Sequence, residues 1–345
     1  MTKSTSSGKK RRGLSQGAAA YSGLFLFFVI LFLSGTAGLL STNLMRYLLQ
    51  IFLYIALGQA WNLLSGFAGM TSLGQQLYIG LAGYAVAVAT ASLGLSPYAG
   101  IGLGIAAGIL VSAALSLILF RMEGMYFAIA TWIAAEAVEK VFLNTEYVGQ
   151  GSGMTVRIVP YPSVTWIYLA SILICCFSIA SVCLVLHSRL GLGLMAMRDD
   201  PAAAQACGVN LVKARLSVYI LAAVICALTG SLFFIHKGTI YPESGFSSGW
   251  TVSSVFICII GGTGTIAGPA AGAVLYVLLG EFLAHYPGWS NIMLGAVTLL
   301  VIFFLPEGIA GFIHKKTGIS LFTRRRRADT ASGGFHAGKE GGSGP

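Results

Sequence analysis

Charged residues are scarce in this chain of 345 residues. Only 9% of the residues are Asp, Glu, Lys or Arg, whereas 56% are apolar, and the mean hydropathy is positive. Several apolar runs exceed the roughly 18 residues that a helix needs to cross a bilayer. These runs lack the period-two alternation of a membrane β-barrel, and only helices and closed barrels satisfy every backbone group in lipid. The composition therefore predicts an all-α polytopic membrane protein.

The chain also lacks recognisable catalytic and metal-binding patterns. It contains no GxxxxGK[ST] phosphate loop, no nucleophile elbow and no cluster of His, Cys and carboxylate residues. Its six cysteines have neither metal-ligand spacing to a histidine nor a disulfide-like pattern, which indicates small buried apolar residues. We expect no enzyme and no metal site. An energy-coupled transporter built on this chain would need its ATPase on another polypeptide.

The net charge of +10 does not indicate nucleic-acid binding, because aromatic residues do not interleave with the basic ones. With the N-terminus inside, 17 Lys and Arg residues fall on one side of the predicted membrane and 4 on the other. This bias predicts that both termini are cytoplasmic and that the number of crossings is even. The basic clusters at 9–12 and 324–327 would face anionic membrane lipid.

We predict about ten transmembrane segments (eight to ten), some of them interrupted by Gly-rich breaks. The transmembrane domain would cover residues 20–312, with a cytoplasmic loop at 188–214 and basic, disordered tails at 1–19 and 313–345. Segment 250–262 is too short to cross the hydrocarbon as a straight helix. The predicted spans are 20–40, 44–64, 76–94, 97–120, 125–143, 165–187, 215–236, 250–262, 268–284 and 289–306.

Glycine is abundant, with 45 residues, and two Gly-rich breakers lie in the two halves of the chain, at 65–76 and 261–269. Paired interruptions at membrane depth indicate a pathway near the midplane of a transporter. The alternative is that both are tight interhelical turns without substrate contact. The candidate residues of the path in and near the breaks are Gly66, Gly69, Ser72, Gly74, Gln75, Tyr78, Gly261, Gly262, Gly264 and Thr265.

Glu136 is a further candidate for the path, because it is an ionisable residue within an apolar segment. It shares a predicted helix face with Lys140 at i, i+4. Such a pair would be an ion pair inside the bundle, a site for a substrate ammonium group, or a salt bridge at the membrane interface.

A short segment between two predicted spans carries the signals of a capped helix. Asp200 can act as N-cap, Pro201 suits the first helical position, and Gly208 suits the left-handed residue after the last turn. The residues between them are mostly alanine and would make roughly two turns, about 10 Å. A short helix with such small side chains would dock into a groove on another protein. The alternative is a surface loop with a helical turn and no partner.

Several glycine-containing segments are weak signals alone but specific together. They are 62–69 (NLLSGFAG) with 72–75 (SLGQ) and 83–84 (GY), 124–131 (GMYFAIAT), 261–265 (GGTGT) with 268–269 (GP) and 272–273 (GA), and 305–309 (LPEGI). In this combination, residues 44–312 resemble the LivM-type permease subunit of branched-chain amino-acid ABC importers. Permeases for urea or short amides in the same subfamily, and a self-sufficient secondary transporter, remain as alternatives.

The resemblance implies a location in the bacterial plasma (inner) membrane and transport by alternating access. It implies a heterodimer with a second permease subunit, two cytoplasmic ABC ATPase subunits that carry ATP and Mg, and an extracytoplasmic solute-binding protein. No cofactor is expected on this chain. We expect the helix ends at the breaks to favour a substrate carboxylate and Glu136 to meet the ammonium group.

The resemblance also identifies the capped segment with the loop that couples such permeases to their ATPases. The acidic position of the family pattern falls on Ala202, and carboxylates stand just upstream instead. The expected coupling residues are Arg198, Asp199, Asp200, Pro201, Ala203, Ala204 and Gly208.

Overall fold

The computed structural model describes residues 28–38, 40–158 and 161–283, together with 292–293, 295–296, 299–300, 303 and 308–311. The predicted tails at 1–19 and 313–345 lie outside these residues. Most of the predicted span 289–306 also lies outside them, as do residues 305–307 of the last sequence segment.

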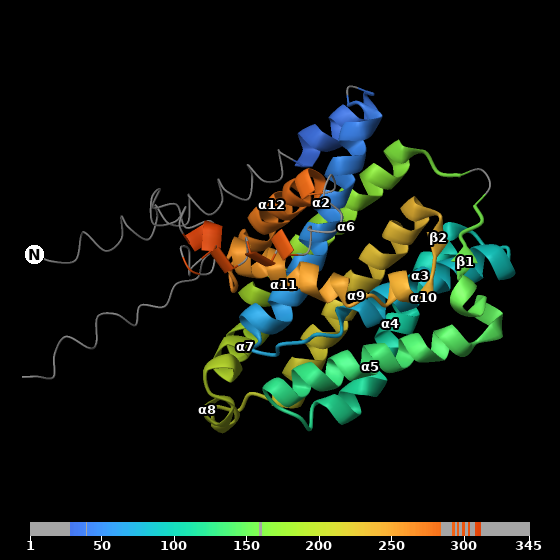
Figure 1. The fold of residues 1–345 in the computed structure, drawn as a ribbon. Coiled ribbons are helices and arrows are strands. Elements are labelled where there is room, and N and C mark those ends of the chain that lie inside the picture. Colours follow the sequence, from blue (N-terminus) through green and yellow to red (C-terminus); the bar gives the residue numbers. More distant parts are fainter. Residues whose placement is uncertain are drawn as a thin grey trace, which may run out of the picture.

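The first half of the described chain is a series of apolar helices joined by short connections (Figure 1). Ser41 and Ser96 begin two of these helices, since each serine side chain accepts a hydrogen bond from a backbone N–H of the first turn. The elements are α2 (Thr42–Trp61), η1 (Asn62–Phe67), α3 (Gln75–Ala87), η2 (Val88–Ser92), α4 (Pro97–Leu119), α5 (Met125–Asn144), η3 (Glu146–Val148), η4 (Gln150–Ser152) and β1 (Met154–Thr155).

The second half contains two long helices separated by two short ones. Ser163 and Asn210 cap the long helices in the same way. A two-residue antiparallel ladder pairs Met154 with Ile240 and so ties the two halves together. The elements are α6 (Val164–His187), α7 (Arg189–Asp199), α8 (Pro201–Ala206), α9 (Leu211–Lys237), β2 (Thr239–Ile240), α10 (Pro242–Gly245), α11 (Gly249–Gly261) and α12 (Gly268–Leu283).

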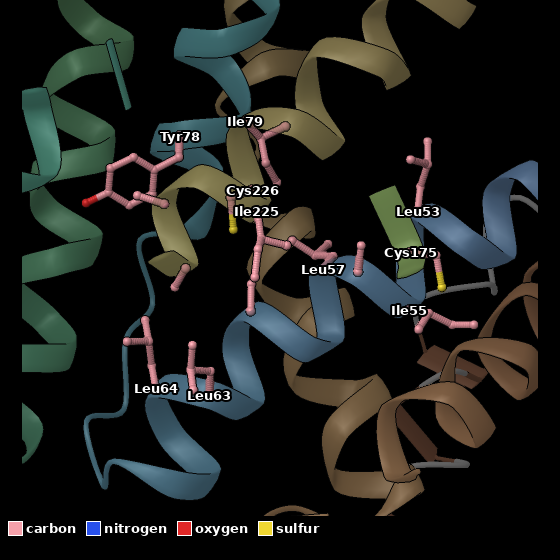
Figure 2. Packing of buried hydrophobic residues seen from close by; sticks show 14 of the residues in the cluster. Leu53, Ile55, Leu57, Leu63, Leu64, Tyr78, Ile79, Cys175, Ile225 and Cys226 are labelled. Carbon is pink, nitrogen blue, oxygen red and sulfur yellow. The ribbon is translucent and has the colours of Figure 1, made fainter. Parts of the chain in front are cut away.

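Helix α9 joins two groups of helices. On one side it packs against α3 and α4, and on the other against α2 and α6, while α11 and α12 complete the group around α2. Buried side chains from α2, α3, α6 and α9 make one continuous apolar core (Figure 2). Small residues allow close approach, since a Cβ on Gly230 of α9 would lie 2.5 Å from the carbonyl oxygen of Ile79 on α3. The bundle is therefore packed tightly around α9.

Five helical segments in the described part of the chain are long and apolar enough to cross a membrane. They are Thr42–Phe67, Pro97–Leu119, Val164–His187, Leu211–Lys237 and Pro242–Gly261. The chain is helical as predicted, but a count of eight to ten crossings stays a prediction. The predicted spans 76–94 and 125–143 are helical in α3, η2 and α5, yet they do not meet the same criteria of length and hydropathy.

Helix α11 (Gly249–Gly261) matches the predicted segment 250–262 and is as short as predicted, but a second short helix precedes it. Pro242 starts the short helix α10, in which Ser244 Oγ accepts a hydrogen bond from the Tyr241 N–H at 3.2 Å. Together with α11 it forms a 20-residue helical segment, Pro242–Gly261, which meets the criteria for a span. Sequence inspection missed this start because Gly245 and Gly249 resemble a loop.

Candidate functional site

The first Gly-rich break begins with a change of helix type. Helix α2 widens into the π-helical turn η1, and the Ala68 N–H donates to Leu63 O at 3.2 Å. The chain then reverses, because Trp61 Nε1 donates to the carbonyl oxygen of Ser72 at 3.0 Å. Residues 68–74 therefore fold back along the end of α2 before α3 begins at Gln75.

The second break separates α11 from α12. Helix α11 ends at Gly261, which packs so tightly that a Cβ there would overlap the carbonyl oxygen of Gly268. Gly262 and Gly264 both have positive φ, at 111° and 73°. Thr265 Oγ1 accepts a hydrogen bond from the Gly268 N–H at 3.0 Å and so caps α12. Both predicted interruptions are present.

Two amide side chains of α2 and η1 tie the breaks to each other. Asn62 Nδ2 donates to Thr265 O at 2.8 Å, and its Oδ1 accepts from the Gly264 N–H at 2.8 Å. Gln59 Nε2 donates to Ile266 O at 2.6 Å. Both amide residues are fully buried. Sequence reasoning missed them, although two amide residues three positions apart in an apolar helix indicate a buried polar contact.

The start of α3 forms a second polar cluster. Leu73 N–H donates to Thr131 Oγ1 of α5 at 3.0 Å, and Thr251 of α11 donates to the side-chain oxygen of Gln76. Gln75 and Gln76 are 2% and 0% exposed. The Nε2 atoms of both residues lack a hydrogen-bond partner within the described part of the chain. Unused donors in a buried site are costly, and they are available to a ligand.

The other candidates of the first break surround this second cluster. Ser72 is buried, and its Oγ accepts from the Gly74 N–H at 3.4 Å. Gly74 faces α5 closely, since a Cβ would lie 2.5 Å from Thr131 O. Tyr78 lies one turn further along α3, edge-on to Tyr219 of α9 at 6.0 Å between ring centroids.

The two polar clusters lie at opposite ends of α11. Thr251 contacts the start of α3, whereas Gly261 leads into the break that meets Asn62. Ten helical residues separate them, which corresponds to about 15 Å along the helix axis. Helix α2 and η1 together form one candidate span, and Asn62 lies near its end. The start of α3 is about 15 Å from that end and is buried, so it lies inside the bundle.

Of the alternatives for Glu136 and Lys140, an ion pair between these two side chains is not formed among the described residues. Lys140 Nζ lies 3.6 Å from Glu139 Oε1, and Glu136 Oε1 instead accepts from Trp132 Nε1 at 3.2 Å. The buried face of α5 passes through Thr131, Ala135 and Glu139 at intervals of four residues. Glu136 lies about 100° away around the helix and is half-exposed, apart from both polar clusters.

Helix α8 has the cap that the sequence predicts, and it lies at one end of the bundle (Figure 1). Asp200 Oδ1 accepts from the N–H groups of Ala202 and Ala203 at 2.9 and 3.1 Å. Pro201 is the first helical residue, and Gly208 has φ of 85°. Ala204 is buried against the bundle, while Ala203 faces outward. Asp199 ends α7 and is exposed.

Arg198 connects α7 with the first break. Its Nη1 donates to the carbonyl oxygen of Gly66. A Cβ on Gly69 would lie 3.1 Å from Arg198 Cγ, and a Cβ on Gly264 would lie 3.4 Å from Arg198 Nη1. The predicted coupling residue and the predicted path residues of both breaks therefore meet in one place.

A groove of about 470 Å³ lies beside α8, between α7 and α9. Arg189 and Lys213 give it a positive charge, and Gly208 and Val209 form part of its wall. The end of the bundle that carries α8 therefore has two features that a partner protein can bind, the helix α8 and the positively charged groove beside it.

Comparisons with known proteins agree with this arrangement. Residues 43–305 match the family described as "Branched-chain amino acid transport system / permease component". The chain is 25% identical over 332 residues to the high-affinity branched-chain amino acid transport system permease protein LivM of Salmonella typhimurium, covering 85% of this chain and 76% of that protein. Identity to LivM of Escherichia coli is 25% over 293 residues, covering 74% of this chain and 67% of that protein.

A sugar permease also matches, over a shorter stretch. The fructose import permease protein FrcC of Rhizobium meliloti is 29% identical over 114 residues, covering 31% of this chain and 32% of that protein. No solved structure matches the chain.

Proposed function

Since the chain belongs to the family of branched-chain amino acid transport permease components, as a LivM-type multi-pass membrane protein, we propose that it imports branched-chain amino acids. The similarity to LivM proteins over most of the chain carries this proposal. The protein would be the non-catalytic permease of an ATP-driven importer. The polar clusters at the two helix breaks would belong to its substrate path.

The permease requires partners for this activity. A second permease subunit would complete the membrane unit, two cytoplasmic ATPases would bind ATP and Mg, and an extracytoplasmic solute-binding protein would deliver the substrate. Helix α8, with the positive groove beside it, would dock onto the ATPases. This arrangement has α8 and both termini on the cytoplasmic side, in agreement with the Lys and Arg bias of the sequence.

The start of α3 is the best supported point of substrate contact. A helix N-terminus carries partial positive charge, and here it lies inside the bundle beside two buried amide groups with unused donors. Such a site favours the carboxylate of an amino acid over an uncharged amide or a sugar. Glu136 lies apart from this cluster, which weakens our prediction that it meets the ammonium group.

Uptake of labelled leucine tests this function. A strain that lacks this chain would be complemented with the wild-type gene, with unlabelled isoleucine, urea or fructose as competitors. We expect restored leucine uptake that isoleucine blocks and that urea and fructose do not. If the wild-type gene restores uptake of labelled urea or fructose but not of labelled leucine, the substrate would be reassigned within the same permease architecture.

A further inference from the structure

We propose that Arg198 is the positioning residue through which movement of helix α8 reaches both Gly-rich breaks. This inference rests on the proposed importer function, because it assumes that partner ATPases displace α8. It assigns to Arg198 a role inside the permease, in addition to any contact with a partner.

The contacts of one side chain carry the inference. The guanidinium group of Arg198 bonds the Gly66 carbonyl of the first break and lies against Gly264 of the second. Its aliphatic stem packs on Gly69. Asn62 of η1 bonds Gly264 and Thr265 of the second break and lies against Gly66 of the first, so a displacement of Arg198 would be shared between the breaks.

The link between Arg198 and α8 is short and stiff. Only Asp200 separates the last residue of α7 from the first residue of α8. Its N–H donates to Ala196 O at 3.0 Å, while its carboxylate caps α8. Asp200 is therefore bonded to both helices, and a push on α8 moves the end of α7 with it.

The acceptor of Arg198 is well suited to such a contact. Gly66 O is among the last carbonyl groups of η1, where the helix dipole places partial negative charge. A guanidinium group has several donors in a rigid fork and stays charged, so it can follow this carbonyl over a range of positions. Lysine at position 198 would retain the charge with a single flexible donor group.

The test uses the complete importer, reconstituted in vesicles with its ATPases and binding protein. Transport and ATP hydrolysis are measured together for Arg198→Gln, Arg198→Lys and the control Arg121→Gln. Arg121 is also exposed but lies in the connection between α4 and α5. We expect the number of substrate molecules moved per ATP to fall about tenfold in Arg198→Gln, as loss of a charge-assisted bond predicts. Arg198→Lys should recover part of this ratio, and Arg121→Gln should match the wild type.

A second measurement does not depend on substrate. Thr71 is exposed in the first break, so Thr71→Cys can report on it in a Cys207→Ser background, which removes the exposed thiol of the coupling loop. We expect ATP to change the rate of maleimide labelling at position 71, and Arg198→Gln to abolish this change.

The outcomes separate the two proposals. Failure of the wild-type complex to move leucine would contradict the proposed substrate, while the ATP-dependent labelling would still decide the role of Arg198. An unchanged transport-to-ATP ratio in Arg198→Gln would overturn the inference. Equal loss of transport and hydrolysis, in proportion to a smaller amount of assembled complex, would also overturn it, because Arg198 would then only cap η1.

Discussion

Two uncharged amide side chains, those of Gln59 and Asn62, connect the two helix breaks of this permease. Asn62 alone satisfies one carbonyl and one N–H group of the second break, across about 200 residues of sequence. Within a bundle of low dielectric constant, such bonds are specific because an unsatisfied partner is costly. The breaks are therefore fixed by the identity of a few single residues.

Replacing Asn62 with alanine should destabilise the protein. Two buried backbone groups would lose their partner, which corresponds to about 2–3 kcal/mol in total. Thermal unfolding of the purified complex measures this change. Asn144→Ala is the control, because Asn144 is exposed and bonds only Lys140 O of its own helix, and its Tm should not move. Equal Tm values for both variants would contradict a structural role of Asn62.

Replacing Gln75 with methionine should separate stability from transport. The change removes a buried donor that has no partner among the described residues and only a long bond of 3.5 Å from Thr251 Oγ1, which also donates to Gln76, so stability should stay equal or rise by about 1 kcal/mol. Leucine uptake should fall about tenfold if this amide binds the substrate carboxylate. Gln59→Met is the matched control and should lower Tm, because Gln59 Nε2 bonds Ile266 O. Normal uptake in Gln75→Met would remove Gln75 from the path.

Single residues also show the limit of sequence reasoning. The acidic character of α5 is evident from sequence, but which carboxylate faces inward depends on the rotation of the helix. That rotation is set by contacts of Thr131 and Ala135 with the rest of the bundle. Sequence reasoning chose Glu136, and the structure buries Glu139 instead.

Among the elements, those with local signals were predicted well. The cap of α8 needs only Asp200, Pro201 and the glycine at 208, all within nine residues, and the sequence predicts it correctly. The π-helical turn η1 and the reversal at 68–74 could not be predicted, because they depend on bonds such as Trp61 to Ser72 that form only in the folded bundle. The glycines predicted that the helices break, but not that the two breaks touch.

The end of α8 offers a test at this scale. Gly208 has φ of 85° and donates its N–H to Gln205 O at 2.9 Å. Proline fixes φ near −65° and has no N–H, so Gly208→Pro should disrupt the turn and abolish leucine uptake at normal membrane levels. Gly208→Asn should retain most uptake, since asparagine tolerates the left-handed conformation. Normal uptake in Gly208→Pro would argue against coupling through this loop.

The whole molecule was predicted in class but not in detail. Composition and the pattern of the apolar runs predicted a helical membrane protein, because only helices and closed barrels satisfy the backbone in lipid and the runs lack the alternation of barrel strands. The number of crossings was less accessible, since α3 is a short helix that its neighbours bury almost completely, whereas α5 carries the charged residues Glu136, Glu139 and Lys140. Hydropathy reports lipid exposure, and α3 is shielded from lipid by its neighbours.

Membrane orientation can be measured through Cys207. This thiol is exposed directly after the last residue of α8, whereas Cys175, Cys226 and Cys258 are buried. We expect a membrane-impermeant maleimide to label Cys207 in inside-out vesicles and not in intact cells, and the ATPases to protect it. Cys207→Ser identifies the labelled site. Labelling from outside would reverse the proposed topology, and labelling that ATPases do not reduce would place their docking elsewhere.

The bond between Arg198 and Gly66 has a consequence for how the gene can vary. The acceptor is a main-chain oxygen, which a residue of any type at position 66 would provide. The donor is a side-chain guanidinium group, which exists only when position 198 is arginine. In a randomised library selected for growth on imported leucine, positions 65 and 71 should accept many amino acids. Position 66 should stay glycine, because a Cβ there would overlap Asn62 Oδ1, and position 198 should return almost exclusively arginine.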